Sequence, residues 1–433
     1  MYMKFLYKKP LTTLVIWGIL YRLAIVFFYG HITVFPDSEG YQMLAQLLAD
    51  ANLSGYDGTR SPGYPILLTL LGNNPALLIA LQMLVGIGGS VLVFKNLRLL
   101  KFSAVTALII SLSLDSLLHV VFYETCILTE SVTLFLMMLI FNILLNNYFE
   151  EKPVWVEFLT GLLLAYLVMV KPFYIFLPFT IYGFYILKNF YPKAFLNSKI
   201  VIVVIPMTAF LSWSYVNKMN TGYFVPTTFY GFNLAQNCVH FAEKAPKKYA
   251  FISDIYVRHR EKTIREGGDV AMSIWSAYPE LQEKTKLSIA DLSFELQSFS
   301  KAAIKNNPGD YLKQVVVSWS DFWRTGIYWN TAEFRVKKAA PVFILIWDIE
   351  HYVLKFFKIA FLLNLPLLLY AFVKNRTFSP EIIISTIIIA ASWLQAFSVY
   401  GTNSRFSYPF EFLMVFVVLM QLKNILAYRK TRK

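Results

Sequence analysis

The chain has few cysteines, charges and histidines for its length, and each shortage excludes a class of protein. Its 433 residues include two cysteines, too few for the disulfide framework of a small secreted domain. Only 15% of the residues are charged, which is well below the share in soluble domains. The five histidines lack the spacing of a metal site. We find no glycine-rich phosphate loop, no repeat of fixed period and no low-complexity run. These shortages argue against a soluble multidomain protein.

Hydrophobic residues are abundant instead. They make up 57% of the chain, and the mean hydropathy is +0.52. A spanning helix needs roughly 20 apolar residues. About ten runs qualify, and they cover residues 11–29, 64–94, 102–122, 127–148, 155–170, 173–188, 200–216, 342–373, 381–399 and 408–427. The sequence therefore predicts an all-α polytopic membrane protein of about ten transmembrane helices.

Three of these runs have particular features. The first follows Lys4, Lys8 and Lys9 like a signal sequence, but it is long for one and no small-residue cleavage site follows, so we expect a retained helix. The second is interrupted at 72–75, which fits a broken helix or a re-entrant piece. The eighth begins with an amphipathic stretch, 347–351, that we place on the membrane surface.

The distribution of basic residues predicts the orientation. If the N-terminus is cytoplasmic, the short outer loops carry only Arg60, Lys171 and Arg405. The inner ends then carry Lys4, Lys8, Lys9, Lys95, Arg98, Lys101, Lys152, Lys188, Lys193, Lys199, Lys374, Arg376, Lys423, Arg429, Lys430, Arg432 and Lys433. Basic residues favour cytoplasmic loops, so both termini are predicted inside. The same rule explains the net charge of +14 without a nucleic-acid partner.

Residues 217–340 differ from the rest because they are polar and hold no convincing span. Residues 280–305 and 310–319 have helical spacing, and Asn306-Asn307-Pro308-Gly309 is a typical helix start. We therefore divide the chain into a membrane module (1–216), a mainly helical extracytoplasmic domain (217–340) and a second membrane module (341–433). The cysteines, Cys126 and Cys238, are expected to be free thiols.

Polar residues that could carry chemistry collect on the outer side of this topology. Ionisable groups at membrane depth are costly and are often functional. The candidates are Asp37, Glu39, Arg60, Tyr64, Glu124, Glu130, Lys171, Asn403 and Arg405. The first outer loop, 31–64, holds the first four of them.

Structural roles compete with this functional interpretation. Asp37 and Glu39 also suit the first turn of a helix over 38–49, where acids favour the dipole. Arg60 and Lys171 also suit the membrane interface as anchors that extend their charged ends to water. Asp37-x-Glu39 could hold a divalent cation through its oxygens. Two acids are a weak signal, so the sequence leaves metal dependence open.

Other charges have alternatives inside the protein. Glu124 fits an interfacial position, and Glu130 needs a partner such as Lys171 or Arg405. Arg405 is suited to clamp a phosphate with two parallel hydrogen bonds. For Arg22, inside the first run, the alternatives are extension to the interface, a lipid phosphate or a pairing acid.

Several short motifs resemble a known family. An acidic first outer loop precedes Arg60-x-Pro-Gly-Tyr-Pro65, the stretch 307–312 precedes Phe322-Trp323, and the last outer loop reads Ser404-Arg-Phe-x-x-Pro409. In this order they resemble bacterial GT-C glycosyltransferases of the protein O-mannosyltransferase and aminoarabinose-transferase types. The resemblance covers nearly the whole chain, although each motif is short and degenerate.

The resemblance implies an inverting transfer of a sugar from a polyprenyl-phosphate carrier to an acceptor outside the cytoplasm, in the plasma (inner) membrane. Asp37 matches the first-loop acid that serves as base, and Arg405 would hold the carrier phosphate. The protein mannosyltransferases have adjacent Asp and Glu where this chain has Asp-Ser-Glu, which puts the role of Glu39 and a protein acceptor in doubt. A glycolipid, a polysaccharide and a protein all stay open as acceptors.

Two other functions fit parts of the pattern. O-antigen ligases and polysaccharide polymerases also use a large late outer loop and outer arginines, but they do not require the early acids. A transporter or flippase would favour paired repeats and midplane charges. The charges here lie at one face.

Overall fold

Helices are the dominant secondary structure in the part of the chain that the structure describes. The computed structural model describes residues 9–146, 150, 153–189, 197–401 and 403–431. Within these ranges the only β-pairing is an isolated bridge between Thr33 and Cys126. Cys126 and Cys238 are buried free thiols.

Six helical segments within the described residues are long and apolar enough to cross a membrane. They are α2 (Pro10–Phe28), α5 (Pro75–Leu99), α11 (Val201–Thr221), α17 (Ala340–Asn375), α18 (Pro380–Ser398) and a last segment formed by α19 (Ser404–Ser407), η9 (Tyr408–Phe410) and α20 (Glu411–Thr431). Helices α6 (Ala104–Asp115) and α7 (Leu118–Glu124) qualify only as a pair bent by 58°. Helices α8 (Glu130–Leu145) and α9 (Val154–Val170) are apolar but shorter. The protein is thus an all-α, multi-pass membrane protein.

The breaks in the helices have local causes. The second predicted run forms α4 (Gly63–Leu70) and α5, because Gly72 and Asn73 take positive φ values of 64° and 55° between them. The side chain of Asn74 then caps α5 by accepting from the backbone N–H groups of Ala76 and Leu77. Residues 347–351, expected to lie on the membrane surface, belong to the first part of the continuous α17.

A second group of helices follows α11. It contains α12 (Tyr230–Gln236), α13 (Ala250–Arg265), α14 (Ser273–Thr285), α15 (Ile289–Asn306) and α16 (Pro308–Phe322). Among the apolar residues whose spacing predicts a helix over 280–305, Leu281, Leu292, Leu296 and Phe299 are fully buried in the hydrophobic core of this group, and Leu287 packs against that core partly buried. The predicted helix over 280–305 is divided at 286–288, where Lys286 has a φ of 57° and Ser288 caps α15. Helix α16 begins at the predicted Asn307-Pro308 start.

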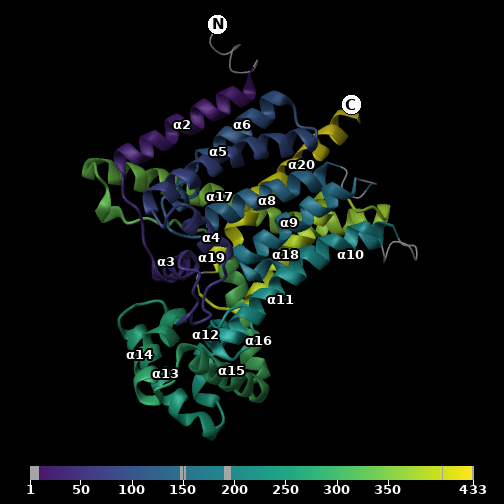
Figure 1. Cartoon of the computed structure of the whole chain (residues 1–433). Coiled ribbons are helices and arrows are strands. Elements are labelled where there is room, and N and C mark those ends of the chain that lie inside the picture. Colours follow the sequence, from purple (N-terminus) through teal and green to yellow (C-terminus); the bar gives the residue numbers. More distant parts are fainter. Residues whose placement is uncertain (1–8, 147–149, 151–152, 190–196, 402, 432–433) are drawn as a thin grey trace.

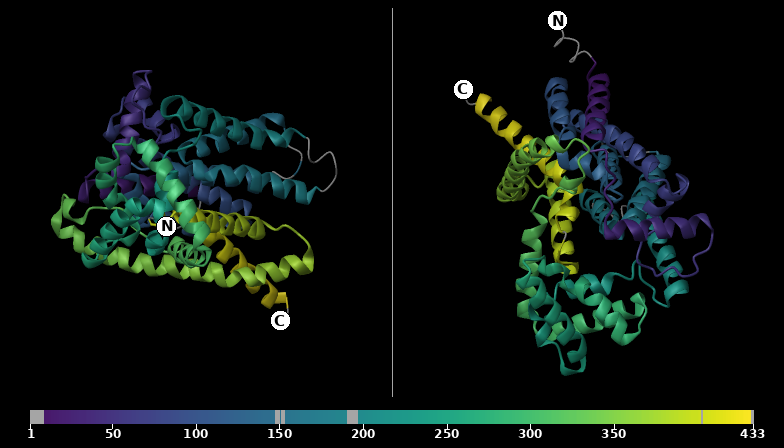
Figure 2. Two further views of the ribbon diagram at one scale, coloured as in Figure 1. Left: turned by 90° about the horizontal axis from the view of Figure 1, so that it is seen from below. Right: turned by 90° about the vertical axis from the view of Figure 1, so that its left-hand side faces the viewer.

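The two groups of helices lie at opposite ends of the molecule. The start of α2 and the end of α20 are at one end, and α13–α15 are at the other (Figure 1). In a second view α18 and α20 (yellow) run toward the teal and green helices of the second group (Figure 2, right). Two shorter helices, α3 (Pro36–Ala49) and α10 (Phe176–Lys188), complete the bundle. The N-terminus of α3 and helix α19 lie where the two groups meet.

Candidate functional site

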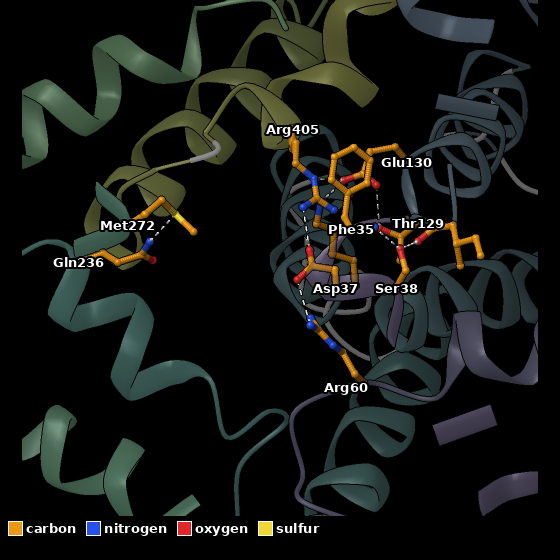
Figure 3. A network of polar contacts seen from close by, with 11 residues as sticks. Phe35, Asp37, Ser38, Arg60, Thr129, Glu130, Gln236, Met272 and Arg405 are labelled. Atoms are coloured by element: carbon orange, nitrogen blue, oxygen red, sulfur yellow. Dashed lines mark hydrogen bonds and ion pairs between the residues drawn. The ribbon is translucent and has the colours of Figure 1, made fainter. Parts of the chain in front are cut away.

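Five charged side chains from distant parts of the chain form a continuous series of ion pairs, here called the Asp37 cluster. Asp37 accepts from Arg60 Nη2 on Oδ1 at 2.9 Å and from Arg405 Nη1 on Oδ2 at 2.7 Å. Arg405 Nε also donates to Glu130 Oε1 at 2.8 Å, and Lys171 Nζ lies 3.3 Å from the same oxygen. Figure 3 shows the Asp37 carboxylate between the two guanidinium groups. Three cations and two acids leave one excess positive charge.

The loop before α3 places Asp37 beside α8. Thr33 pairs with the loop before α8 through Thr33 N–H to Thr125 O and Ile127 N–H to Thr33 O, at 3.0 and 3.2 Å. Ser38 fixes the first turn of α3, because its hydroxyl donates to Ile127 O and accepts from Phe35 N–H. Asp37 in the first turn therefore lies near Glu130, the first residue of α8.

Arg60 is held by aromatic rings and by a fixed loop. Its guanidinium lies over Tyr41 at 4.9 Å and over Phe229 at 4.7 Å from the ring centroids, a favourable cation–π arrangement. Gly40 leaves room for the Arg60 side chain, because a Cβ at this position would lie only 2.7 Å from Arg60 Nε. The loop is tied to residues 227–228, where Thr228 N–H donates to Gly58 O at 2.9 Å. The buried Nε has no hydrogen-bond partner among the described residues.

Lys171 and Arg405 reach the cluster from helix ends. Lys171 follows α9 directly, and its ammonium lies 4.6 Å from the centroid of Phe406. Arg405 lies on the short α19, and its guanidinium carbon is 5.8 Å from the ring centroid of Tyr328. Asn403 fixes the loop before Arg405 by donating to the carbonyl and hydroxyl oxygens of Ser318 on α16.

The two acids of the cluster differ in their exposure to solvent. The Asp37 side chain is 32% exposed, whereas that of Glu130 is 0% exposed. Burial alone would raise the pKa of Asp37, but Arg405 and then Arg60 outweigh it and hold that pKa below the ordinary value. Asp37 is therefore an ionised, reachable carboxylate, and Glu130 is an internal counter-charge for Arg405 and Lys171.

The structure does not bring four of the sequence candidates into the cluster. Glu39 is exposed on α3 and makes no ion pair with any described residue. Tyr64 is fully buried, and its hydroxyl donates to Gln82 Oε1 at 2.9 Å. Asn403 acts on the loop rather than on the charged groups. Glu124 is buried and belongs to a different ion cluster.

That other cluster answers the question left open for Arg22. Arg22 on α2 binds Glu124 at 2.6 and 2.8 Å and Asp115 at 3.0 and 3.3 Å. All three side chains are nearly fully buried. We call these residues the Arg22 cluster.

A metal site at Asp37 and Glu39 finds no support in the geometry. Residues i and i+2 of a helix do not face each other. Among the described residues no group of three or more His, Cys, Asp or Glu side chains could hold a metal ion.

Sequence reasoning missed the aromatic residues that hold the cations and several buried charges. Tyr41, Phe229 and Tyr328 have no distinguishing pattern among the 27 tyrosines and 38 phenylalanines of the chain. The pair Lys358 Nζ and Glu411 Oε1, at 2.7 Å, could have been found, because both residues interrupt apolar runs.

The site as a whole combines one solvent-accessible carboxylate with two arginines. Each arginine has further N–H groups besides the one that it donates to Asp37. Such a site can accept a proton and bind an anion in the same place. The chain matches no protein-family model, and no curated protein is significantly similar to it.

Proposed function

We propose that this protein is a GT-C-type membrane glycosyltransferase that moves a sugar from a polyprenyl-phosphate carrier to an extracytoplasmic acceptor with inversion. The observation that carries the proposal is the position of Asp37, a partly exposed carboxylate held between Arg60 and Arg405. These residues come from the first-loop and last-loop motifs that resemble the family. The acceptor is a glycolipid, a polysaccharide or a protein.

The proposed topology has about ten spans, with α4–α5 and α6–α7 each counted as one bent span and the shorter α8, α9 and α10 included. Both termini are cytoplasmic, and residues 217–340 with the Asp37 cluster lie on the outer face of the plasma (inner) membrane. The lysine and arginine distribution supports this orientation. The common location of the start of α2 and the end of α20, opposite α13–α15, agrees with it (Figure 1).

The chemistry requires a base and an anion site close together. The acceptor hydroxyl loses its proton to Asp37 as its oxygen bonds to the anomeric carbon. The bond from that carbon to the carrier phosphate breaks, and its electron pair leaves with the phosphate. Arg60 and Arg405 stabilise the charge that develops there, with Lys171 behind them. Inversion follows because the acceptor attacks opposite the leaving phosphate.

The resting ion pairs suggest an order of events. With both arginines bound to it, Asp37 is a weak base, since its pKa is depressed. A donor phosphate offers the arginines a stronger bidentate partner. As Arg60 and Arg405 turn to the phosphate, Asp37 loses its counter-charges and its basicity rises. The donor therefore binds first and activates the base for the acceptor.

A transfer assay tests this function. Purified protein is incubated with radiolabelled polyprenyl-phosphate sugars and membrane extract, with and without EDTA, and the labelled product is identified. Asp37→Asn should lower transfer by roughly 10²–10⁴-fold, the usual contribution of a general base. Glu39→Gln is the matched control, because this carboxylate lies on the same helix turn outside the cluster, and it should retain transfer.

Full activity of Asp37→Asn would remove Asp37 as the base. Label transfer only from diphosphate-linked oligosaccharides would indicate a ligase or polymerase instead. Movement of the lipid-linked sugar across vesicles without any glycosylated product would indicate a transporter.

A further inference from the structure

The Arg22 cluster lies inside the bundle and does not belong to the proposed transfer site. Its carboxylates sit at the ends of two helices, because Asp115 is the last residue of α6 and Glu124 the last of α7. Gly86 on α5 makes room for the cluster, since a Cβ there would lie 1.8 Å from Glu124 Oε1. Two buried carboxylates face one guanidinium, so the cluster carries one uncompensated negative charge when both carboxylates are ionised.

A small cavity adjoins these carboxylates. Its volume is about 20 Å³, which is room for about one water-sized ligand. The polar residues that line it all present oxygen atoms, and they are Ser90, Ser111, Asp115, Glu124, Ser131 and Tyr408. No lysine, arginine or histidine lies among the described residues of its wall.

Two of these oxygens lack partners. The hydroxyls of Ser131 and Tyr408 are buried and make no hydrogen bond to any residue that the structure describes, and these two residues are 5% and 2% exposed. Buried polar atoms are normally satisfied, so the unpaired hydroxyls point to a ligand in the cavity. The hydroxyl of Ser111 donates to Ala107 O at 2.7 Å, and its lone pairs remain free to accept.

The charge and the donor set favour a cation over a water molecule. A buried net charge is strongly unfavourable unless an opposite charge compensates it. Oxygen-only ligands suit hard cations. The C-terminal end of α6 adds partial negative charge beside Asp115, as the ends of broken helices do at sodium sites of membrane transporters.

We propose that this cavity is a binding site for one small monovalent cation of the sodium type. The ion takes oxygen ligands from Asp115, Glu124, Ser131 and Tyr408, and it neutralises the cluster. Its ligands join α6, α7, α8 and η9 inside the bundle. Ser131 follows Glu130 in the chain, and Tyr408 lies three residues after Arg405. A bound ion therefore also restricts the motion of these two members of the Asp37 cluster. The proposal does not depend on sugar transfer.

Thermal unfolding tests the site without any activity assay. The full chain, purified in detergent, is unfolded at one pH and one ionic strength in sodium, potassium or choline chloride, with tryptophan fluorescence as the signal. Sodium should raise the midpoint by a few degrees in a saturable manner, and choline should not. Equilibrium dialysis with radioactive sodium should give about one ion per chain.

Variants separate the site from general salt effects. Ser131→Ala and Asp115→Asn should each abolish the sodium-dependent shift. Ser214→Ala is the matched control: this buried serine on α11 donates to Phe210 O, does not line the cavity, and should keep the shift. Equal midpoints of the wild type in all three salts would overturn the proposal. So would a shift that persists in both cavity variants, or a midpoint that responds to pH but not to sodium, which would identify a proton as the compensating charge.

Discussion

The Asp37 cluster and the Arg22 cluster are built alike but differ in charge and access. Each joins arginine and carboxylate groups from segments far apart in the sequence, at distances of 2.6–3.3 Å. The Asp37 cluster has one cation in excess, and one of its two acids, Asp37, is 32% exposed. The Arg22 cluster has one acid in excess, and its side chains are 1–3% exposed.

This difference shows what each cluster is suited to do. In the open cluster, which has surplus positive charge, an anionic ligand can replace the Asp37 carboxylate on the arginines, because solvent and substrate can reach it. A sealed cluster with surplus negative charge cannot exchange partners readily, so its free energy depends on a small compensating ion. Under the two proposals, the same residue types serve anion chemistry in one place and cation-dependent stability in the other.

Loss of Arg22 should have the largest effect, and it should be on stability. Arg22→Gln leaves Asp115 and Glu124 buried without their cation, and breaking a buried ion pair in this way costs about 3–5 kcal/mol. The unfolding midpoint of the full chain in detergent should fall sharply. The triple variant Arg22→Gln, Asp115→Asn, Glu124→Gln has no buried charge in the cluster and should recover most of the loss. A triple variant as unstable as the single one would show that packing, not charge, dominates here.

Arg405→Lys tests the open cluster and should act on turnover. A lysine retains the positive charge but cannot contact Asp37 and Glu130 at once through a planar fork. The weaker stabilisation of the leaving phosphate should lower the transfer rate by roughly 10²-fold, measured as kcat in the labelled-sugar assay. Arg324→Lys is the control, because Arg324 is 76% exposed at the end of α16 and pairs with Asp321. Equal losses in the two variants would contradict a specific role for Arg405.

The sequence predicted the helical membrane architecture well, because apolar runs and helix-start signals are local properties. The run at 102–122 and the Asn307-Pro308 start both correspond to observed elements, apart from the bend at α6–α7. Charge counting also placed Asp37, Arg60 and Arg405 at one face. Their pairing could not be predicted, since it depends on how the ends of α3 and α8 and the short α19 are turned toward each other.

The failures have the same physical origin. Glu124 looks like a loop acid in the sequence, yet the bend between α6 and α7 turns it inward to Arg22. Asp115 lies inside an apolar run and was the available signal for that partner, since an acid at membrane depth requires one. Tyr64 was a candidate site residue in the Arg60-x-Pro-Gly-Tyr-Pro65 motif, and its side chain packs in the core.

The smallest expected effect is a pH-dependent contribution of Asp37 to stability. Its pKa is lower in the folded protein than in the unfolded chain, so its stabilisation is fully present above the unfolded pKa of about 3.9. That stabilisation is lost as the pH falls toward the folded pKa. At neutral pH the free energy of unfolding of the wild type should exceed that of Asp37→Asn by about 1 kcal/mol. This value is modest because the carboxylate is partly exposed.

Unfolding midpoints of the two proteins should therefore differ above about pH 5 and converge below about pH 4, as the unfolded aspartate takes up its proton. When Arg60→Gln is added to both proteins, the neutral-pH difference between them should shrink, because one of the two cations that depress the pKa of Asp37 is gone. A difference that stays constant down to the lowest pH would mean that the Asp37→Asn substitution acts through shape rather than through charge. The open cluster would then resemble the sealed one in depending on packing, and the exchange of Asp37 for a phosphate would lose its electrostatic basis.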